Sequence, residues 1–275
     1  MKFYKYHALG NDYLVLDPAD QHLELTGSQI TRICDRHYGV GADGILFGPE
    51  HSVDCDYALR IFNPDSSEAE KSGNGLRIFS RYLWDRSLVS GERFSIETKG
   101  GVVHAQVARD GLSVTVGMGK IYFSHDRSES GSTVKAEVIT VDGVDFTYYR
   151  ASVGNPHCVI FHDRENVSYA KSYGAEIEKS PGFANGTNVQ FVRVLDRNTI
   201  DIDIWERGAG YTFASGSSST AAAGVAHALG YCDANIDVRM PGGVINISID
   251  DQFNATMTGD VRKVCEGTIA AEAFY

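Results

Sequence analysis

Ser72-Gly73-Asn74-Gly75 and its counterpart Ser215-Gly216-Ser217-Ser218 decide the fold of this chain. Each stretch opens a segment whose composition predicts a helix, and each follows a Gly-Asn turn at nearly the same distance. Asn11 precedes Ser72 by 61 positions, and Asn155 precedes Ser215 by 60. A layout that occurs twice indicates an internal repeat. We therefore expect two similar lobes.

Composition and charge exclude several classes of protein. The 275 residues are 43% hydrophobic and 22% charged, which is typical of a globular chain. The net charge of −11 disfavours binding to nucleic acid and to anionic lipid, because both need clustered Lys and Arg. The first residues lack the apolar core of a signal peptide, and no apolar run reaches the length of a membrane span. We expect a cytoplasmic protein.

The cysteines and histidines do not form a metal-binding or disulfide pattern. The five cysteines are an odd number and contain no Cys-x-x-Cys pair, so we expect buried or half-buried thiols rather than disulfides or a zinc site. His7, His37 and His157 lie near the motifs but lack the spacing of metal ligands. We therefore expect no metal site.

The remaining pattern predicts an α+β fold. Short alternating segments bounded by Gly, Asn and Asp predict strands, and Gly100-Gly101 and Asp110-Gly111 predict hairpin turns. Helices are expected at 28–38, 73–85, 168–173 and 216–229, the last ending at Gly230. We expect two pseudo-symmetric lobes, each a central helix wrapped by mostly antiparallel strands. Their predicted limits are 1–120 and 121–262, with a closing segment at 263–275 that returns to the first lobe and a linker at 124–135.

The two serines each have a structural and a chemical interpretation. Serine is a favoured N-cap, so each one alone predicts a helix start. Together, two glycine-rich helix starts present backbone N–H groups that favour an anion. If both hold one carboxylate, Ser72 and Ser215 stand on opposite faces of the neighbouring carbon. That arrangement removes a proton from one face and returns one to the other.

Further polar residues follow the predicted strands. Glu206-Arg207 ends a strand-like run just before the second helix start, where Arg207 is suited to a bidentate contact with a second carboxylate. Asn63 follows the run 60–62, and Asn188 follows Gly186 by two positions. Each of these asparagines alone is typical of a turn.

At this point the chain resembles the diaminopimelate epimerase family. Seven segments fall in that family's order: HALGNDY (7–13), RHYGVGADG (36–44), NPDSSE (63–68), GNGLR (73–77), GNPH (154–157), GTNV (186–189) and WERGAG (205–210). Several independent motifs in order are far more specific than one glycine-rich loop.

The resemblance implies a cofactor-free and metal-free enzyme that interconverts LL- and meso-diaminopimelate in lysine and cell-wall synthesis. Two cysteines of that family act as base and acid on opposite faces of the α-carbon. By position, the backbone of Gly73, Asn74, Gly216 and Ser217 would bind the reacting carboxylate. Recognition of the distal end would fall to Asn11, Asn63, Asn155, Asn188, Glu206 and Arg207. The expected partner is an amino-acid substrate, and the chain is compatible with a homodimer.

The departures from the family lie at the reacting centre. Both catalytic cysteine positions hold serine here, Ser72 and Ser215, while Tyr211 stands at a usual Glu and Ser66 at a usual Gly. A thiol has a reference pKa of ~8.5, and an alcohol lies far closer to the ~15.7 of water. Even a gap of about four units between Cys and Ser would correspond to roughly 5 kcal/mol, or about four decades in rate. We expect weak or absent epimerase turnover through two unassisted serines.

Three interpretations remain open. The chain is an epimerase whose cysteines were replaced, or a natural serine-containing branch with a related proton-shift isomerase activity, or a non-catalytic binder of a diaminopimelate-like amino acid. The differences at Tyr211 and Ser66 lie outside the acid/base pair, and a deliberate two-site change does not account for them. They favour the natural branch.

Overall fold

The computed structural model describes residues 1–20, 25–123, 133–164 and 168–274. They form two compact units, Met1–Gly117 with Thr258–Tyr275, and Met118–Met257. The chain passes between the units within strand β8 (Ser113–Lys120) and again within β17 (Asn254–Asp260). The limits predicted at 120/121 and 262/263 stay a prediction, and residues 124–132 of the predicted linker lie outside the described residues.

The first unit is built from antiparallel hairpins joined by two parallel pairings. Its strands are β1 (Lys2–Ala8), β2 (Asn11–Leu16), β3 (Gly44–Glu50), β4 (Tyr57–Phe62), β5 (Glu68–Ala69), β6 (Phe94–Thr98), β7 (Gly101–Val107), β8 and β18 (Arg262–Thr268). Its helices are η1 (Pro18–Asp20), α1 (Gly27–Cys34), α2 (Gly73–Asp85) and η2 (Ala271–Phe274). The parallel pairs are β2–β3 and β4–β6, and β18 returns to pair with β1.

The second unit repeats this order of elements. Its strands are β9 (Ala136–Val141), β10 (Val144–Ser152), β11 (Pro156–Phe161), β12 (Asn188–Asp196), β13 (Thr199–Glu206), β14 (Gly210–Thr212), β15 (Asn235–Met240), β16 (Gly243–Ile249) and β17. Its helices are α3 (Tyr169–Glu178) and α4 (Gly216–Ala228). The parallel pairs are β11–β12 and β13–β15, at the same places in the order as in the first unit.

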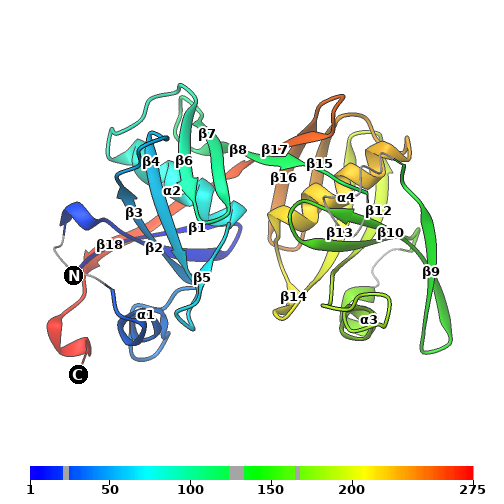
Figure 1. Cartoon of the computed structure of the whole chain (residues 1–275), viewed down its shortest axis with the longest axis horizontal. Coiled ribbons are helices and arrows are strands. Elements are labelled where there is room, and N and C mark those ends of the chain that lie inside the picture. Colours follow the sequence, from blue (N-terminus) through cyan, green and yellow to red (C-terminus); the bar gives the residue numbers. More distant parts are fainter. Residues whose placement is uncertain (21–24, 124–132, 165–167, 275) are drawn as a thin grey trace. The chain divides into compact units, whose positions relative to one another are not determined.

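The repeat extends to the register of individual residues. Tyr13 of β2 lies opposite Gly44 of β3, and His157 of β11 lies opposite Asn188 of β12, each in a parallel pair. Helix α2 packs against strands of the first unit and α4 against strands of the second (Figure 1). The predicted mixed α+β class, with one central helix for each set of mostly antiparallel strands, is confirmed.

Both central helices begin where the sequence predicts. Helix α2 spans Gly73–Asp85 and buries Phe79, Tyr82 and Leu83. Helix α4 starts at Gly216 and ends at Ala228, one residue earlier than predicted, with Gly230 at a positive φ of 74° just beyond it. Its alanine face is fully buried, and a Cβ at Gly224 would lie 2.7 Å from the Ile121 side chain. The small residues therefore allow close packing around α4.

Two predicted helices have different limits. The helix expected at 28–38 ends at Cys34, because Asp35 is extended and its carboxylate accepts the N–H groups of His37 and Tyr38 at 2.7 Å. Thr26 caps it and forms a reciprocal capping box with Gln29. The helix expected at 168–173 runs on to Glu178. Among the described residues, no helix combines the length and apolar character needed to cross a bilayer.

Candidate active site

Ser72 is the N-cap of α2 in the first unit. Its backbone is extended, with φ −139° and ψ 116°, and its Oγ accepts the N–H of Gly75 at 3.0 Å. A serine cap of this kind stabilises a helix by about 1 kcal/mol. The side chain is half-buried, and the N–H groups of Gly73 and Asn74 belong to the same first turn. The structural role predicted for Ser72 is thus real, and it places a hydroxyl at a helix N-terminus.

Tyr13 contacts this serine from strand β2. Its phenolic oxygen lies 3.1 Å from Ser72 Oγ, and the residue is only 7% exposed. A Cβ at Gly44 would lie 2.6 Å from the Tyr13 ring, so the absence of a side chain at Gly44 makes room for the ring. Sequence reasoning missed Tyr13 as a site residue. Its spacing of two from Asn11 places both on one face of the strand, which is the signal that identifies it.

An amide network orients Asn11 and Asn74 beside Ser72. Asn74 Nδ2 donates to Asn11 Oδ1 at 3.0 Å, and Asn11 Nδ2 donates to Asp43 at 2.8 Å. Arg77, which is fully buried, donates to Asn74 Oδ1 at 2.5 Å. Burial lowers the pKa of the Arg77 guanidinium to about 10. Because each amide has a fixed donor and acceptor, the orientation of both asparagines is set.

Charged residues support the turn that carries Asn11. Asp12 forms ion pairs with Lys5 at 2.9 Å and with Arg36 at 2.7 Å, and Arg36 also pairs with Asp43. Burial alone would raise the pKa of the Asp12 carboxyl, but Arg36 and Lys5 more than offset this and hold it at about 2. The carboxylate therefore stays ionised and buttresses the turn.

Asn63 lies in a separate turn of the first unit. Its carbonyl accepts the N–H of Ser66, and its Nδ2 donates to Ser67 Oγ at 2.9 Å. Ser66 has a φ of 70°, a conformation that costs a residue with a Cβ about 1–2 kcal/mol. The position where the family usually has glycine thus keeps the backbone shape that suits glycine.

Ser215 repeats the arrangement of Ser72 in the second unit. It is the N-cap of α4, with φ −146° and ψ 124°, and its Oγ accepts the N–H of Ser218 at 3.4 Å. Ser215 is only 4% exposed, so it is more enclosed than Ser72. Ser217 Oγ lies 3.5 Å from Ser215 Oγ. The longer cap bond leaves Ser215 less firmly engaged with its own helix.

Glu206 is the ionisable neighbour of Ser215. Burial raises the pKa of the Glu206 carboxyl, and a hydrogen bond with Ser215 partly opposes that rise. Glu206 ends β13 and pairs with Gly210 of β14, so it stands on the other face of the hairpin from Trp205 and Tyr211. The carboxyl thereby faces the start of α4.

Asn155 and His157 form the polar surroundings of Ser217. Asn155 Nδ2 donates to Ser217 Oγ at 3.4 Å, and Asn155 Oδ1 is 3.0 Å from His157 Nε2. Burial lowers the pKa of His157 to about 3, against the opposing effect of Gln190. Its imidazole is therefore neutral at physiological pH and orients Asn155.

Asn188 links two further segments of the second unit. Its Nδ2 donates to the Pro156 carbonyl at 2.9 Å, and its Oδ1 accepts the backbone N–H of Arg207 at 3.0 Å. The Arg207 side chain is exposed and donates to the Asn185 carbonyl at 3.3 Å. Asn188 thus holds the backbone of Arg207 through a hydrogen bond, while the Arg207 guanidinium itself is exposed to solvent.

Tyr211 lies away from Ser215. It is paired with Trp205 across the β13–β14 hairpin, and the Lys171 ammonium of α3 lies 4.4 Å from its ring centroid. Burial raises its pKa, and a hydrogen bond with Asp203 adds to the rise. This residue therefore fastens the hairpin to α3.

Within each unit the structure brings most predicted site residues together. The first unit joins Asn11, Ser72, Gly73 and Asn74, with Asn63 in its own turn. The second joins Asn155, Asn188, Glu206, Arg207, Ser215, Gly216 and Ser217 through the bonds described above. Tyr13 and His157 complete the two sets.

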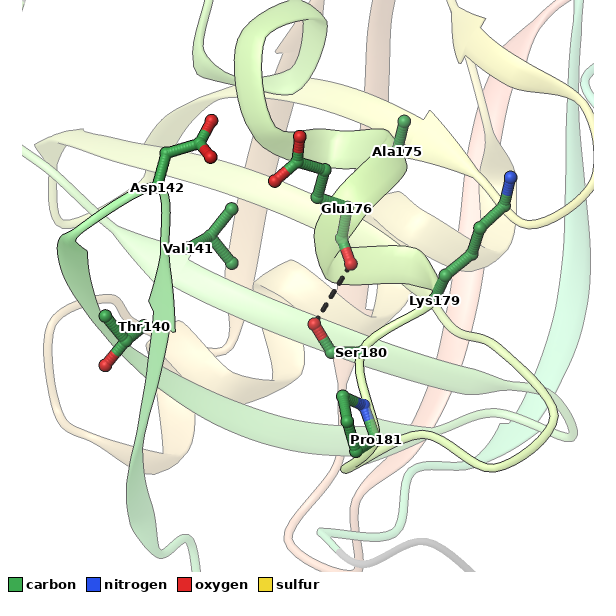
Figure 2. A pocket seen from close by; sticks show the side chains of 8 residues that line it. All are labelled: Thr140, Val141, Asp142, Ala175, Glu176, Lys179, Ser180 and Pro181. Carbon is green, nitrogen blue, oxygen red and sulfur yellow. Dashed lines mark hydrogen bonds between the residues drawn. The ribbon is translucent and has the colours of Figure 1, made fainter.

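A hollow of about 480 Å³ lies elsewhere in the second unit. It is lined by the β9–β10 turn and by the end of α3, where Ser180 Oγ donates to the Glu176 carbonyl at 3.0 Å (Figure 2). Its lining residues are Thr140, Val141, Asp142, Ala175, Glu176, Lys179, Ser180 and Pro181. None of them is a predicted site residue.

Comparison with protein sequences identifies close relatives over the whole chain. A family model described as "Diaminopimelate epimerase" matches residues 3–124 and 149–264. Diaminopimelate epimerase 2 of Nostoc sp. is 56% identical over 277 residues, covering 100% of this chain and 97% of that protein. Diaminopimelate epimerase of Caldanaerobacter subterraneus is 36% identical over 278 residues, covering 98% and 99%.

Solved structures share the fold at low sequence identity. A phenazine biosynthesis protein of the PhzF family from Bacillus anthracis superposes with a TM-score of 0.68 at 17% identity, covering 98% of this chain and 99% of that one. A hydroxyproline epimerase from Agrobacterium vitis superposes with a TM-score of 0.68 at 16% identity, covering 97% and 91%. At these identities the likeness concerns the fold alone.

Proposed function

The chain belongs to the diaminopimelate epimerase family, and on that premise we propose that it interconverts LL- and meso-diaminopimelate as a PLP-independent isomerase of lysine biosynthesis. The observation that carries this proposal is the repeated helix start. Ser72 and Ser215 are both N-caps with extended backbones, and each has its serine oxygen bonded to the third residue of its helix. Such repetition suits a reaction that treats the two faces of one carbon alike.

We assign the acid and base roles to Ser72 and Ser215. The backbone N–H groups of Gly73 and Asn74 in one unit, and of Gly216 and Ser217 in the other, would bind the reacting carboxylate at the positive ends of the two helices. The other predicted contacts to the amino acid are Asn11, Asn63, Asn155, Asn188, Glu206 and Arg207. A cytoplasmic location belongs to the same proposal, and a homodimer stays a prediction.

The serine pair makes this proposed turnover slow. Forming an alkoxide is harder than forming a thiolate by several pKa units, and about four units amount to roughly four decades in rate. The half-buried carboxyl of Glu206 beside Ser215 supports a residual activity, because its raised pKa suits it to accept a proton from that serine. We therefore expect a weak epimerase rather than an inert protein.

The test is isomer interconversion in deuterated water. Purified chain is incubated with LL- or meso-diaminopimelate, and both deuterium incorporation at the α-carbon and the isomer ratio are followed. Slow incorporation that stops on Ser72→Ala or Ser215→Ala supports the proposal. Binding of either isomer in calorimetry without any incorporation would instead establish the second candidate, a binder of diaminopimelate-like amino acids, which the serine pair favours.

A further inference from the structure

Tyr13 and Ser72 form a hydroxyl pair that the family roles leave unassigned. The two oxygens are 3.1 Å apart, Tyr13 is 7% exposed, and Ser72 is half-buried. The serine is thus open on one side and in contact with a nearly dry phenol on another. A proton passing between them need not involve water.

The hydrogen bonds of Ser72 allow two arrangements of the proton between Ser72 and Tyr13. Its oxygen already accepts the Gly75 N–H, and either member of the Tyr13–Ser72 pair can be the donor. When Ser72 donates to the Tyr13 phenolate, the second lone pair of Ser72 is available to take a proton, because the serine can pass its own proton to the phenolate. When Tyr13 donates to Ser72, the serine proton is available as an acid. A hydroxyl has one donor and two acceptor sites, so both states satisfy the cap.

The pairing is particular to the first unit. His157 occupies the position of Tyr13 in the repeat, but its Nε2 lies 3.0 Å from Asn155 Oδ1, and the titratable group that Ser215 acts on is Glu206, whose pKa it lowers. Each serine therefore has a different ionisable neighbour. A phenol has a reference pKa of ~10, so it ionises about six units more readily than an alcohol close to the ~15.7 of water.

We propose that Tyr13 is a positioning residue that exchanges a proton with Ser72 and so lets this serine act as base and acid. The inference rests on the proposed function. As the Cα–H bond breaks, its proton binds Ser72 Oγ, the proton that Ser72 held moves to the Tyr13 phenolate, and the electron pair stays on the substrate. In the reverse direction neutral Tyr13 gives its proton to Ser72 as Ser72 protonates the carbon.

The test compares Tyr13→Phe in two single-cysteine backgrounds. Ser215→Cys keeps Ser72 dependent on Tyr13, whereas Ser72→Cys supplies a thiol that ionises without a phenol. Deuterium incorporation is measured with the isomer for which Ser72→Ala stops exchange. We expect Tyr13→Phe to slow incorporation about 100-fold in Ser215→Cys, a typical general acid–base contribution, and less than about 3-fold in Ser72→Cys.

Two controls separate proton transfer from a structural role. Tyr6→Phe removes another buried hydroxyl from the residue opposite Tyr13 on β1, where it donates to Asp85 at 2.9 Å, and should leave incorporation unchanged. In Ser215→Cys, incorporation should rise with pH in the alkaline range, where a phenol ionises, and Tyr13→Phe should abolish that rise. Thermal melts confirm that each variant is folded.

The outcomes distinguish this inference from the function on which it rests. An equal loss in both backgrounds, or no loss in Ser215→Cys, overturns the role of Tyr13 while the epimerase proposal stands. Substrate binding with exchange only in cysteine variants overturns the proposed turnover of the unaltered chain and establishes the binder of diaminopimelate-like amino acids instead. If neither isomer binds and no variant exchanges the α-proton, the proposed function and the role of Tyr13 both fail.

Discussion

Ser215, the N-cap of α4, acts on the Glu206 carboxyl and opposes the rise that burial causes in the pKa of this group. Burial raises the pKa of this carboxyl above its ordinary value, so the folded chain binds the proton more tightly than the unfolded chain does. Its contribution to stability is therefore greatest below the ordinary pKa of ~4.3 and falls as the pH rises toward the folded value. The ionised carboxylate of Glu206 thus reduces stability near neutral pH.

Glu206→Gln should remove this decrease in stability near neutral pH, because glutamine has a similar shape and does not ionise. The free energy of unfolding, measured by urea titration at pH 4 to 8, should rise relative to the unaltered chain as the pH increases. Glu92→Gln, at an exposed position, controls for the loss of one negative charge from a chain of net charge −11. A difference that is constant across this pH range would contradict the raised pKa.

Ser66→Gly should stabilise the chain. Ser66 has a φ of 70°, which costs about 1–2 kcal/mol, while the added backbone freedom of glycine in the unfolded chain opposes the gain by roughly 0.5–1 kcal/mol. We expect a net increase of about 0.5–1 kcal/mol in the free energy of unfolding by urea titration. Ser67→Gly should do the opposite, because Ser67 Oγ donates to Asp65 at 2.6 Å. Equal effects at both positions would rule out backbone strain at Ser66.

Gly44→Ala should disturb the site through Tyr13. The added Cβ would lie 2.6 Å from both the Tyr13 ring and the Phe62 carbonyl, and overpacking of this kind costs about 1–3 kcal/mol. Displacement of the ring should also lengthen the Tyr13–Ser72 contact and slow α-proton exchange. Gly117→Ala is the matched control, since its Cβ would have no neighbour closer than 3.7 Å. Exchange that survives in a destabilised Gly44→Ala would show that the ring accommodates the methyl group.

Local motifs predict the parts of this molecule that local chemistry determines. A serine before glycine-rich helical sequence forms a cap whether or not it reacts, so Ser72 and Ser215 marked both central helices. The predicted end of α1 was wrong because the Asp35 side chain accepts the N–H groups of His37 and Tyr38. A periodic apolar pattern contains no information about such a hydrogen bond.

The features that could not be predicted from the sequence depend on contacts between segments far apart in the chain. Tyr13 and Ser72 are 59 positions apart, and only the pairing of β2 with β3 beside α2 brings them together. Tyr211 likewise stood out as a departure near Ser215, but its alternation with Glu206 across the β13–β14 hairpin turns it to α3. The identity of a residue does not reveal which face of a hairpin it occupies until the register is known.

Arg207→Lys should weaken binding of diaminopimelate about tenfold. The Arg207 side chain is exposed, and an arginine fork binds a carboxylate through two parallel bonds that a lysine ammonium cannot reproduce. Calorimetry with both isomers measures the change. Arg197→Lys, at an exposed arginine paired with Asp233, should bind as the unaltered chain does. Undiminished affinity in Arg207→Lys would remove this residue from recognition of the distal carboxylate.

Ser72→Cys combined with Ser215→Cys should raise isomer interconversion by up to about four decades, since thiols ionise several units more readily than alcohols. Either single change should do much less for interconversion, because the reaction needs an acid on one face and a base on the other. The measurement is the initial rate from LL-diaminopimelate, with binding of each variant checked by calorimetry. A double-cysteine chain that binds substrate yet stays inert would mean that the site serves other chemistry. An unaltered chain that already turns over as fast as the double variant would mean that its serines are fully assisted, with Tyr13 and Glu206 the neighbours placed to assist them.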